Sequence, residues 1–202
     1  SILHKYNIDR INWNIYCEDS LKKNIDMKFD YVVGNPPYIS YKMLDENTRK
    51  YVRKNFEVCK QGKFDYCYPF IEKGINLLKD NGKIAFLVPG SIFKNVFSKN
   101  LREYLKEDII DIYDYATRKL FNEYATGEKK KILTSSVVFV LQKGSGTKLL
   151  NYYNLDNNNK TILKKKDLEE KWIFNKINNG DKRFGDYFKV SNSIATLCNK
   201  AY

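Results

Sequence analysis

Two short apolar runs near the start of the chain each stop at a polar edge. Residues 13–17 alternate apolar and polar side chains and are followed closely by Asp19. Residues 29–33 form a second run, which ends at Gly34 and leads into the tetrapeptide Asn35-Pro36-Pro37-Tyr38. Alternation with a period of two and a polar or turn-forming boundary are typical of β-strands. We therefore expect two strands, with Asp19 and the tetrapeptide at their carboxyl ends.

Helical and strand patterns then alternate along the chain. Residues 64–79 carry apolar side chains at helical spacing, and Asp80-Asn81-Gly82 supplies a stop signal. A second amphipathic helix is expected at residues 95–106. Further strands are expected at residues 83–88, 109–115 and 135–142. This alternation predicts an α/β fold with a mostly parallel sheet and helices on both faces, whose ligands bind beyond the carboxyl ends of the strands.

Two stretches depart from this rhythm. Residues 116–134 are rich in lysine and polar side chains, so we expect a long exposed connection. Residues 151–202 contain only scattered apolar positions, an asparagine run and a cluster of lysines. We expect the main domain to span residues 1–146, and residues 147–202 to form a linker and the beginning of another region.

Composition narrows the class of protein. Of the 202 residues 43% are hydrophobic, and no apolar run approaches the roughly 20 residues that span a bilayer, so we expect no membrane association. The four cysteines form no C-x-x-C pair and His4 is the single histidine, which predicts no metal site and reduced thiols in a cytoplasmic protein. A single histidine also argues against Ser-His-Asp or Cys-His catalysis.

The formal net charge of +12 suits a polyanionic partner such as nucleic acid, whose phosphates supply most non-specific affinity. Lysine, asparagine, isoleucine and tyrosine are all abundant, however, as expected for any protein from a compositionally biased genome. Charge alone therefore leaves both interpretations open.

The tetrapeptide is the strongest candidate for chemistry. Each proline fixes its own φ and disfavours the helical region for the preceding residue, so the segment is rigid and extended. The side-chain oxygen of Asn35 and the backbone oxygen of Pro36 can accept both hydrogens of one amino group, while Tyr38 offers a ring for stacking. Two such acceptors stabilise the positive charge that develops when an aromatic amine attacks a sulfonium methyl group. The simpler interpretation is a proline turn in which Asn35 caps a backbone group.

These residues resemble the gamma-class amino-methyltransferases of DNA, especially the TaqI-like adenine methylases of restriction-modification systems. The resemblance covers residues 13–143. It rests on Asp19, on Asn35-Pro36-Pro37-Tyr38, and on the segments 62–65, 70–73, 82–89, 101–105 and 121–139. It implies a Rossmann-like methyltransferase fold, S-adenosylmethionine as cofactor, and methyl transfer to an adenine turned out of double-stranded DNA. A restriction or specificity subunit or domain is the further partner that it implies.

The resemblance also implies roles for single residues around the target base. Asn35 and Pro36 would hold the target amino group, Pro37 belongs to the same catalytic motif, and Tyr38 would stack on the extruded adenine. Phe121 would contact that base from another side; its alternative role is a loop aromatic tucked onto the sheet. The lysines beside it, at positions 129–131, are candidates for phosphate contacts, although a lysine run is more often a solvated loop.

Two residues are implied on the cofactor side. Asp19 would accept a hydrogen bond from the amino group of the cofactor adenine, and Phe70 would pack against that ring. A strand-end cap for Asp19 and a core position for Phe70 are the structural alternatives. The family's glycine-rich cofactor turn should lie upstream of Asp19, yet no glycine precedes it, and Ser20 stands where the family often has an aromatic. We therefore expect a fragment whose methyltransferase domain is incomplete at the N-terminus.

Three alternatives share these residues. Protein glutamine methyltransferases use the same tetrapeptide to grip a side-chain amide, and an RNA methyltransferase would need similar chemistry. The segment 86–91, the Leu101-Arg102 pair and the basic loop favour the DNA enzymes instead. The third alternative is a DNA-binding fragment without catalytic activity, because the glycine-rich turn is missing.

Overall fold

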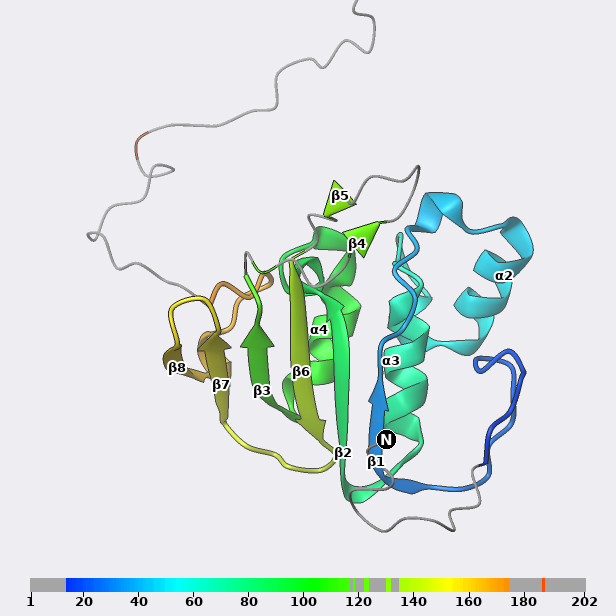
Figure 1. Ribbon diagram of the computed structural model, residues 1–202, viewed down its shortest axis with the longest axis horizontal. Coiled ribbons are helices and arrows are strands. Elements are labelled where there is room, and N and C mark those ends of the chain that lie inside the picture. Colours follow the sequence, from blue (N-terminus) through cyan, green and yellow to red (C-terminus); the bar gives the residue numbers. More distant parts are fainter. Residues whose placement is uncertain are drawn as a thin grey trace, which may run out of the picture.

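The computed structural model describes residues 14–116, 118, 122–123, 130–131, 135–174 and 187. Its centre is a six-stranded sheet in the order β1-β2-β6-β3-β7-β8 (Figure 1). The strands are β1 (Phe29–Gly34), β2 (Leu78–Pro89), β3 (Ile109–Asp114), β6 (Ser136–Gln142), β7 (Leu149–Asn154) and β8 (Asn159–Lys164).

Strand directions confirm a mostly parallel sheet. β1 pairs with β2 and β3 pairs with β7 in parallel, whereas β6 lies antiparallel between β2 and β3, and β8 is antiparallel to β7. Four of the six strands therefore point the same way, so their carboxyl ends meet at one edge of the sheet. A separate two-stranded pair joins β4 (Asn122–Glu123) to β5 (Lys130–Lys131) within the expected long connection.

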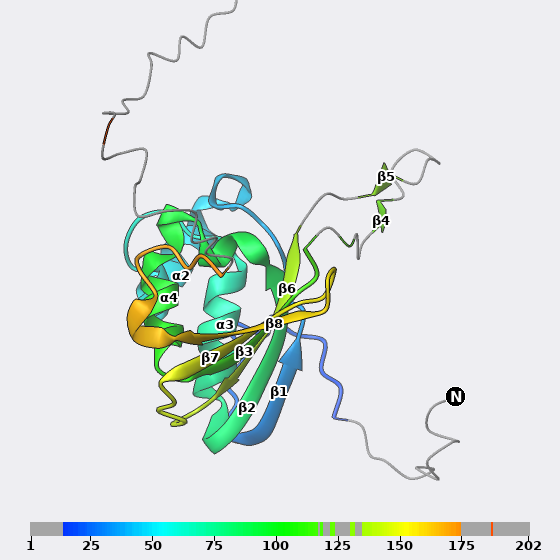
Figure 2. The same cartoon turned by 90° about the vertical axis from the view of Figure 1, so that its left-hand side faces the viewer.

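The helices lie on one side of this sheet. α2 (Glu46–Asn55), α3 (Cys67–Asn76) and α4 (Lys99–Lys106) all lie to the same side in Figure 2. Short 3-10 helices accompany them at Tyr41–Met43, Glu57–Cys59, Gly90–Phe93, Val96–Ser98 and Lys165–Asp167. Ile84, Phe86 and Val88 of β2 are buried under this layer. On the opposite face Tyr31 is 73% and Val33 80% exposed, so the second helical layer expected from the sequence is not found among the described residues.

The predicted strands at residues 29–33, 83–88, 109–115 and 135–142 are confirmed to within about one residue at most ends. The expected strand at residues 13–17 is wrong for residues 14–17, which are exposed and belong to no strand. Residue 13 lies outside the described residues. A strand needs a neighbouring strand to form hydrogen bonds with its backbone N–H and C=O groups, and no described strand lies beside this run.

The helix expected at residues 64–79 is shorter, spanning Cys67–Asn76. The helix end predicted from Asp80-Asn81-Gly82 is wrong, because these residues lie inside the early, irregular part of β2. Asn81 has a φ of +63°, its N–H donates to Lys143 O at 3.0 Å, and Lys143 N donates to Gly82 O at 3.0 Å. The turn-forming residues thus interrupt a strand rather than end a helix.

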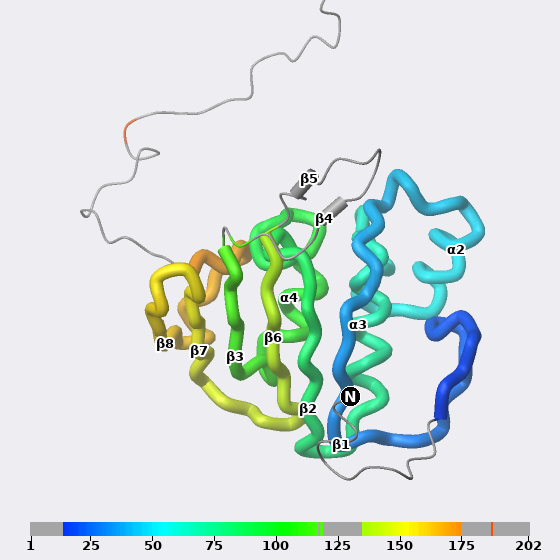
Figure 3. Tube along the Cα trace, in the orientation of Figure 1, coloured from blue at the N-terminus to red at the C-terminus, as the bar shows by residue number. Residues whose placement is uncertain are grey.

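The sheet continues beyond the boundary expected after residue 146, as the tube in Figure 3 shows for β7 and β8. The segment after β8 also packs on the helical layer: Trp172 stacks on Phe93 with ring centroids 5.5 Å apart, and the backbone N–H of Trp172 donates to Phe93 O at 2.8 Å. Arg102 Nε donates to Glu170 O at 2.7 Å. From the sequence we expect no regular alternation of strands and helices after residue 151, and this is wrong for residues 151–174. Their apolar positions are sparse, but long-range packing orders them.

Candidate functional site

The tetrapeptide follows β1 directly, at the edge where the parallel strands end. Gly34 is required there by close approach: a Cβ atom at this position would lie 2.9 Å from Phe86 Cε1. The following residues are free of cis peptide bonds, and Asn35 is exposed while Pro36 is buried. The Asn35 side chain is therefore available to a ligand, whereas the backbone that carries it is fixed against the sheet.

The far end of the tetrapeptide is tied to two other elements. Ile39 O accepts a hydrogen bond from Tyr66 N at 2.8 Å, just before α3. Tyr38 is half-buried, and its hydroxyl interacts with the side chain of Ser136 at the start of β6. Burial, with the nearby Cys67, raises the pKa of Tyr38 to about 12, so this hydroxyl remains protonated at neutral pH. These contacts hold the far end of the segment, while β1 holds its start, as a preorganised acceptor array requires.

Asp19 sits in a turn and not at the end of a strand. Its Oδ1 accepts from Leu21 N at 3.0 Å, and its Oδ2 lies 3.3 Å from Lys22 Nζ. Slight burial raises the pKa of the Asp19 carboxyl, but these two partners together hold it below its usual range. The side chain is 43% exposed and charged at neutral pH, so it can still accept a hydrogen bond from a ligand.

The turn that carries Asp19 is fixed by side chains from the helices. Lys73 of α3 donates from Nζ to Leu21 O at 2.8 Å and to Lys23 O at 2.6 Å. Tyr51 of α2 donates to the same Leu21 oxygen at 3.2 Å. The placement of Asp19 therefore depends on the half-buried Lys73 and its two contacts with backbone oxygens.

Asp19 and Phe70, the two expected cofactor residues, are brought to the same face of α3. Tyr66 and Phe70 meet edge to face with ring centroids 5.3 Å apart, and Lys73 follows on that face of the helix. The charge of Asp19 acts on both ends of this row: after burial, it is a cause of the raised pKa of Tyr66, and it partly offsets the pKa lowering that burial imposes on Lys73. A charged carboxylate can accept a hydrogen bond from the amino group of an adenine, and the neighbouring aromatic side chains can pack against the edge of its ring.

Phe70 is half-buried and also packs on the core, so its core alternative is confirmed in part. Sequence reasoning missed Tyr66 and Lys73. The signal was present, because positions 66, 70 and 73 share the spacing of one helical face, but nothing in the sequence indicated that Lys73 would reach backbone oxygens about fifty residues away.

Other expected site residues are not placed. Phe121 and Lys129 lie outside the described residues, and only the backbone pairing of Lys130 and Lys131 is known. In the described ranges no group of three or more histidine, cysteine, aspartate or glutamate side chains could hold a metal ion. Cys17, Cys59 and Cys67 are free thiols. No helix in the described part of the chain has the length and apolar content to cross a bilayer.

Two of the known proteins that this chain resembles in sequence are type II methyltransferases. M.HincII, a type II methyltransferase of Haemophilus influenzae, is 31% identical over 144 residues, which are 70% of this chain and 27% of that protein. RM.Eco57I, a type II restriction enzyme and methyltransferase of Escherichia coli, is 31% identical over 105 residues, 49% of this chain and 10% of that protein. The chain thus spans about a quarter of the first relative and a tenth of the second.

A solved structure shares the fold. A modification subunit assigned to a type I restriction enzyme of Vibrio vulnificus superposes with a TM-score of 0.50 at 16% identity, covering 67% of this chain and 28% of that one. A family model, the Eco57I restriction-modification methylase, matches residues 2–121, which include Asp19, β1, the tetrapeptide, α3 and β2. This chain belongs to the Eco57I restriction-modification methylase family.

Proposed function

We infer that the chain is the catalytic part of a DNA adenine methyltransferase, which transfers a methyl group from S-adenosylmethionine to the amino nitrogen of an adenine turned out of the duplex. The observation that carries this proposal is the exposed Asn35 amide, which lies between the end of β1 and the buried Pro36 on a segment anchored by the Ile39–Tyr66 hydrogen bond. Phe70 lies on α3, and Lys73 of the same helix binds the turn that carries Asp19. This arrangement supports a cofactor beside the target base.

On the target side, Asn35 Oδ1 and Pro36 O each accept one hydrogen of the adenine amino group. This draws the nitrogen toward tetrahedral geometry and stabilises the positive charge that develops on it in the transition state. The Tyr38 ring stacks on the base and helps to offset the few kcal/mol, on the order of two or three, that extrusion from the duplex costs. Phe121 is the proposed second aromatic contact with the base.

On the cofactor side, Asp19 accepts from the amino group of the cofactor adenine and Phe70 packs against its ring edge. When bound, S-adenosylmethionine supplies an electrophilic methyl group on its sulfonium. The protein positions this group and excludes competing nucleophiles; no step in this proposal requires a protein base, because the product ammonium loses its proton to water. Lys73 is a positioning residue, since it acts through the turn that carries Asp19.

Double-stranded DNA is the proposed substrate, and the net charge of +12 supports phosphate binding. RM.Eco57I is named as a type II restriction enzyme and methyltransferase, so a restriction or specificity subunit or domain is a proposed partner. Residues 147–202 are proposed to lead into a target-recognition region, although residues 149–174 already belong to the sheet and its helical layer.

The test is methyl transfer from labelled S-adenosylmethionine to mixed-sequence duplex DNA by the longest natural protein that contains this chain. The DNA is digested to nucleosides so that methyladenine and methylcytosine are counted separately. Asn35→Ala should lower the rate of methyladenine formation by about 100-fold or more, the usual loss when one transition-state contact is removed. Asn47→Ala, which alters another exposed asparagine, on α2, is the matched control and should leave the rate unchanged.

Each other outcome rejects a specific part of the proposal. Labelled methylcytosine would keep amino-methyl transfer but reject adenine as the target. Label on protein or RNA and not on DNA would favour the glutamine or RNA enzymes, and DNA binding without any transfer would favour a non-catalytic module. Equal rates for Asn35→Ala and the unaltered protein would remove Asn35 from the reaction.

A further inference from the structure

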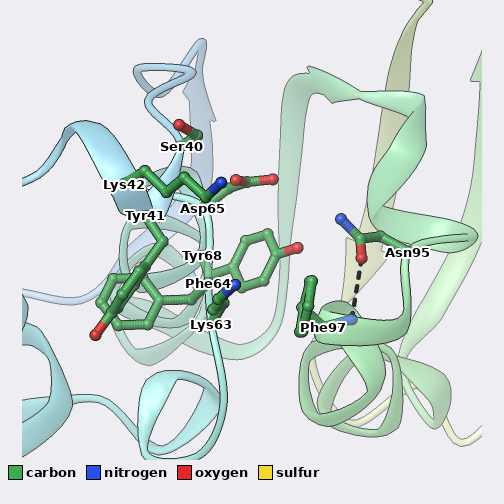
Figure 4. A pocket seen from close by; sticks show the side chains of 9 residues that line it. All are labelled: Ser40, Tyr41, Lys42, Lys63, Phe64, Asp65, Tyr68, Asn95 and Phe97. Atoms are coloured by element: carbon green, nitrogen blue, oxygen red, sulfur yellow. Dashed lines mark hydrogen bonds between the residues drawn. The ribbon is translucent and has the colours of Figure 1, made fainter. Parts of the chain in front are cut away.

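A cavity of about 330 Å³ opens beside the tetrapeptide at the same edge of the sheet. Three chain segments form it: the residues after Tyr38, the residues before and at the start of α3, and the residues after β2 (Figure 4). None of its lining residues belongs to the tetrapeptide or to the Asp19 turn. The cavity is therefore a separate feature, whose volume is at the lower end of the range for small-molecule sites.

The walls of this cavity are held together across the three segments. Ser40 pairs with Asp65 in an isolated antiparallel bridge. Tyr68, on α3, shares a short buried hydrogen bond with Ser98, which follows the third segment. Arg102 donates from Nη1 to Asn95 O at 2.7 Å. Because each segment is tied to another, the shape of the cavity is set by the fold and not by a single loop.

The cavity offers one acceptor and one donor with unused capacity. In the described part of the chain the Asp65 carboxylate has no hydrogen-bond or ion-pair partner, and burial raises its pKa above the usual range. Asn95 uses Oδ1 to accept from Phe97 N at 3.0 Å, which turns its Nδ2 toward the opening. A ligand with a donor and an acceptor on one edge would satisfy both groups.

The rim combines an aromatic ring with positive charge. Phe97 is 49% exposed and lines the opening, and Lys63 Nζ lies 5.5 Å from the centroid of its ring. Lys42 lines the cavity from the first segment. Neither lysine forms an ion pair with any described residue. Two unpaired cations beside an accessible ring are suited to a ligand that has both a phosphate and a flat aromatic group.

We propose that this cavity binds one nucleotide of the DNA other than the target adenine, with its base between Phe97, Asp65 and Asn95 and its phosphate near Lys42 and Lys63. The proposal rests on the proposed function for the identity of the polymer. A nucleobase supplies a flat ring and an edge that carries both donors and acceptors, and its phosphate supplies the negative charge. The nucleotide must be unstacked, because its base can lie against the Phe97 ring only after it has left its neighbours in the duplex.

The test is photochemical cross-linking of the protein to a mixed-sequence duplex in which thymine is partly replaced by bromouracil. Near-ultraviolet light should join a base to Phe97, and trypsin should release the adduct on the peptide that spans residues 95–99. Phe97→Leu should abolish this adduct and weaken DNA binding by roughly tenfold, since one stacking contact is lost. Val96→Ala is the matched control: Val96 is the exposed neighbour, does not line the cavity, and should retain the adduct.

A second pair of variants tests the phosphate contact. Lys63→Gln should reduce the slope of log affinity against log salt by about one, the change expected for one lost phosphate contact. Lys79→Gln removes an exposed lysine at the opposite end of β2, where it pairs with Asp30 at 2.9 Å, and should leave the slope unchanged. Deoxyadenosine monophosphate should suppress the Phe97 adduct more strongly than inorganic phosphate does.

Adducts confined to other peptides, or unchanged DNA binding in Phe97→Leu, would overturn the proposal. Equal suppression by inorganic phosphate would also overturn it, because the cavity would then recognise only the phosphate. Asn35→Ala separates this proposal from the proposed function: it should lower methyl transfer by about 100-fold or more and keep the adduct. An adduct formed by an unaltered protein that methylates no DNA would leave the nucleotide site standing and reject the methyltransferase.

Discussion

The two halves of the candidate site are built in different ways. The acceptor array, residues 35–38, is fixed by its own prolines, by the close contact of Gly34 with Phe86, and by the Ile39–Tyr66 hydrogen bond. The Asp19 turn has no strand behind it in the described residues. It is held in place by side chains that reach it from α2 and α3.

The difference shows where precision is required. Two acceptors must meet both hydrogens of one amino group in the transition state, so a small displacement of the array lowers the rate steeply. The cofactor half provides binding, which tolerates a less rigid support at a modest loss of affinity. We expect changes to the array to act on rate, and changes to the Asp19 turn to act on cofactor affinity.

The largest effect is expected from Gly34→Ala. The added Cβ would approach the Phe86 ring to 2.9 Å, so the backbone that carries Asn35 must shift. Methyl transfer should fall by about 100-fold and the free energy of unfolding by about 1–3 kcal/mol, as measured by steady-state kinetics and denaturant titration. Phe86→Leu should restore part of both losses in the double variant. Additive losses would show that the close contact does not position the array.

A smaller effect is expected from Lys73→Met, which keeps the apolar stem but removes the ammonium. The turn then loses two hydrogen bonds, and cofactor affinity should fall about tenfold because binding must order the turn. The maximal rate at saturating cofactor should change by less than about threefold, a fraction of a kcal/mol. Equilibrium binding and a cofactor titration give the two values, with Lys79→Met as control. A loss confined to the rate would contradict the separation of the two halves.

Asp19→Asn should act more weakly still. The amide keeps an acceptor oxygen but loses its charge, so cofactor affinity should fall about fivefold with little change in stability. Because its partners hold the pKa of Asp19 below 3.8, the carboxylate remains charged from neutral pH down to that value. Cofactor affinity of the unaltered protein should therefore be independent of this group above about pH 4, in isothermal titrations across pH. A drop centred near pH 6 would exclude Asp19 as its cause.

The smallest effect concerns Asp65, beside the array. Burial raises its pKa above 3.8, so the folded protein holds this proton more tightly than the unfolded chain does. Ionisation therefore opposes folding, and this penalty grows as pH rises from about 3.8 through the raised pKa. Asp65→Asn should melt at a slightly higher temperature than the unaltered protein at neutral pH, and the difference should vanish near pH 4. A constant difference across this pH range would contradict the assigned cause.

The sequence located the strands best where each one is a short β-branched or aromatic run that ends at a turn. Residues 29–33 and 135–142 are examples, and both became neighbours of β2 in the sheet. It failed at Asp80-Asn81-Gly82, because a turn-forming tripeptide has the same appearance after a helix as within an irregular strand. It also failed at residues 149–174, where few apolar side chains are needed because β7 pairs with β3 and Trp172 packs on Phe93.

By itself the sequence determined the rigid tetrapeptide, its position after an apolar strand, and the family resemblance that these residues carry. These are local properties, since proline restricts the backbone wherever it occurs and period-two alternation needs no knowledge of the neighbours. Only the tertiary structure decided that Lys73 supports the Asp19 turn, that Phe86 requires a glycine at position 34, and that three distant segments line a cavity beside the array. Each of these is a contact between residues far apart in the chain, and such contacts depend on how the elements pack rather than on any local pattern.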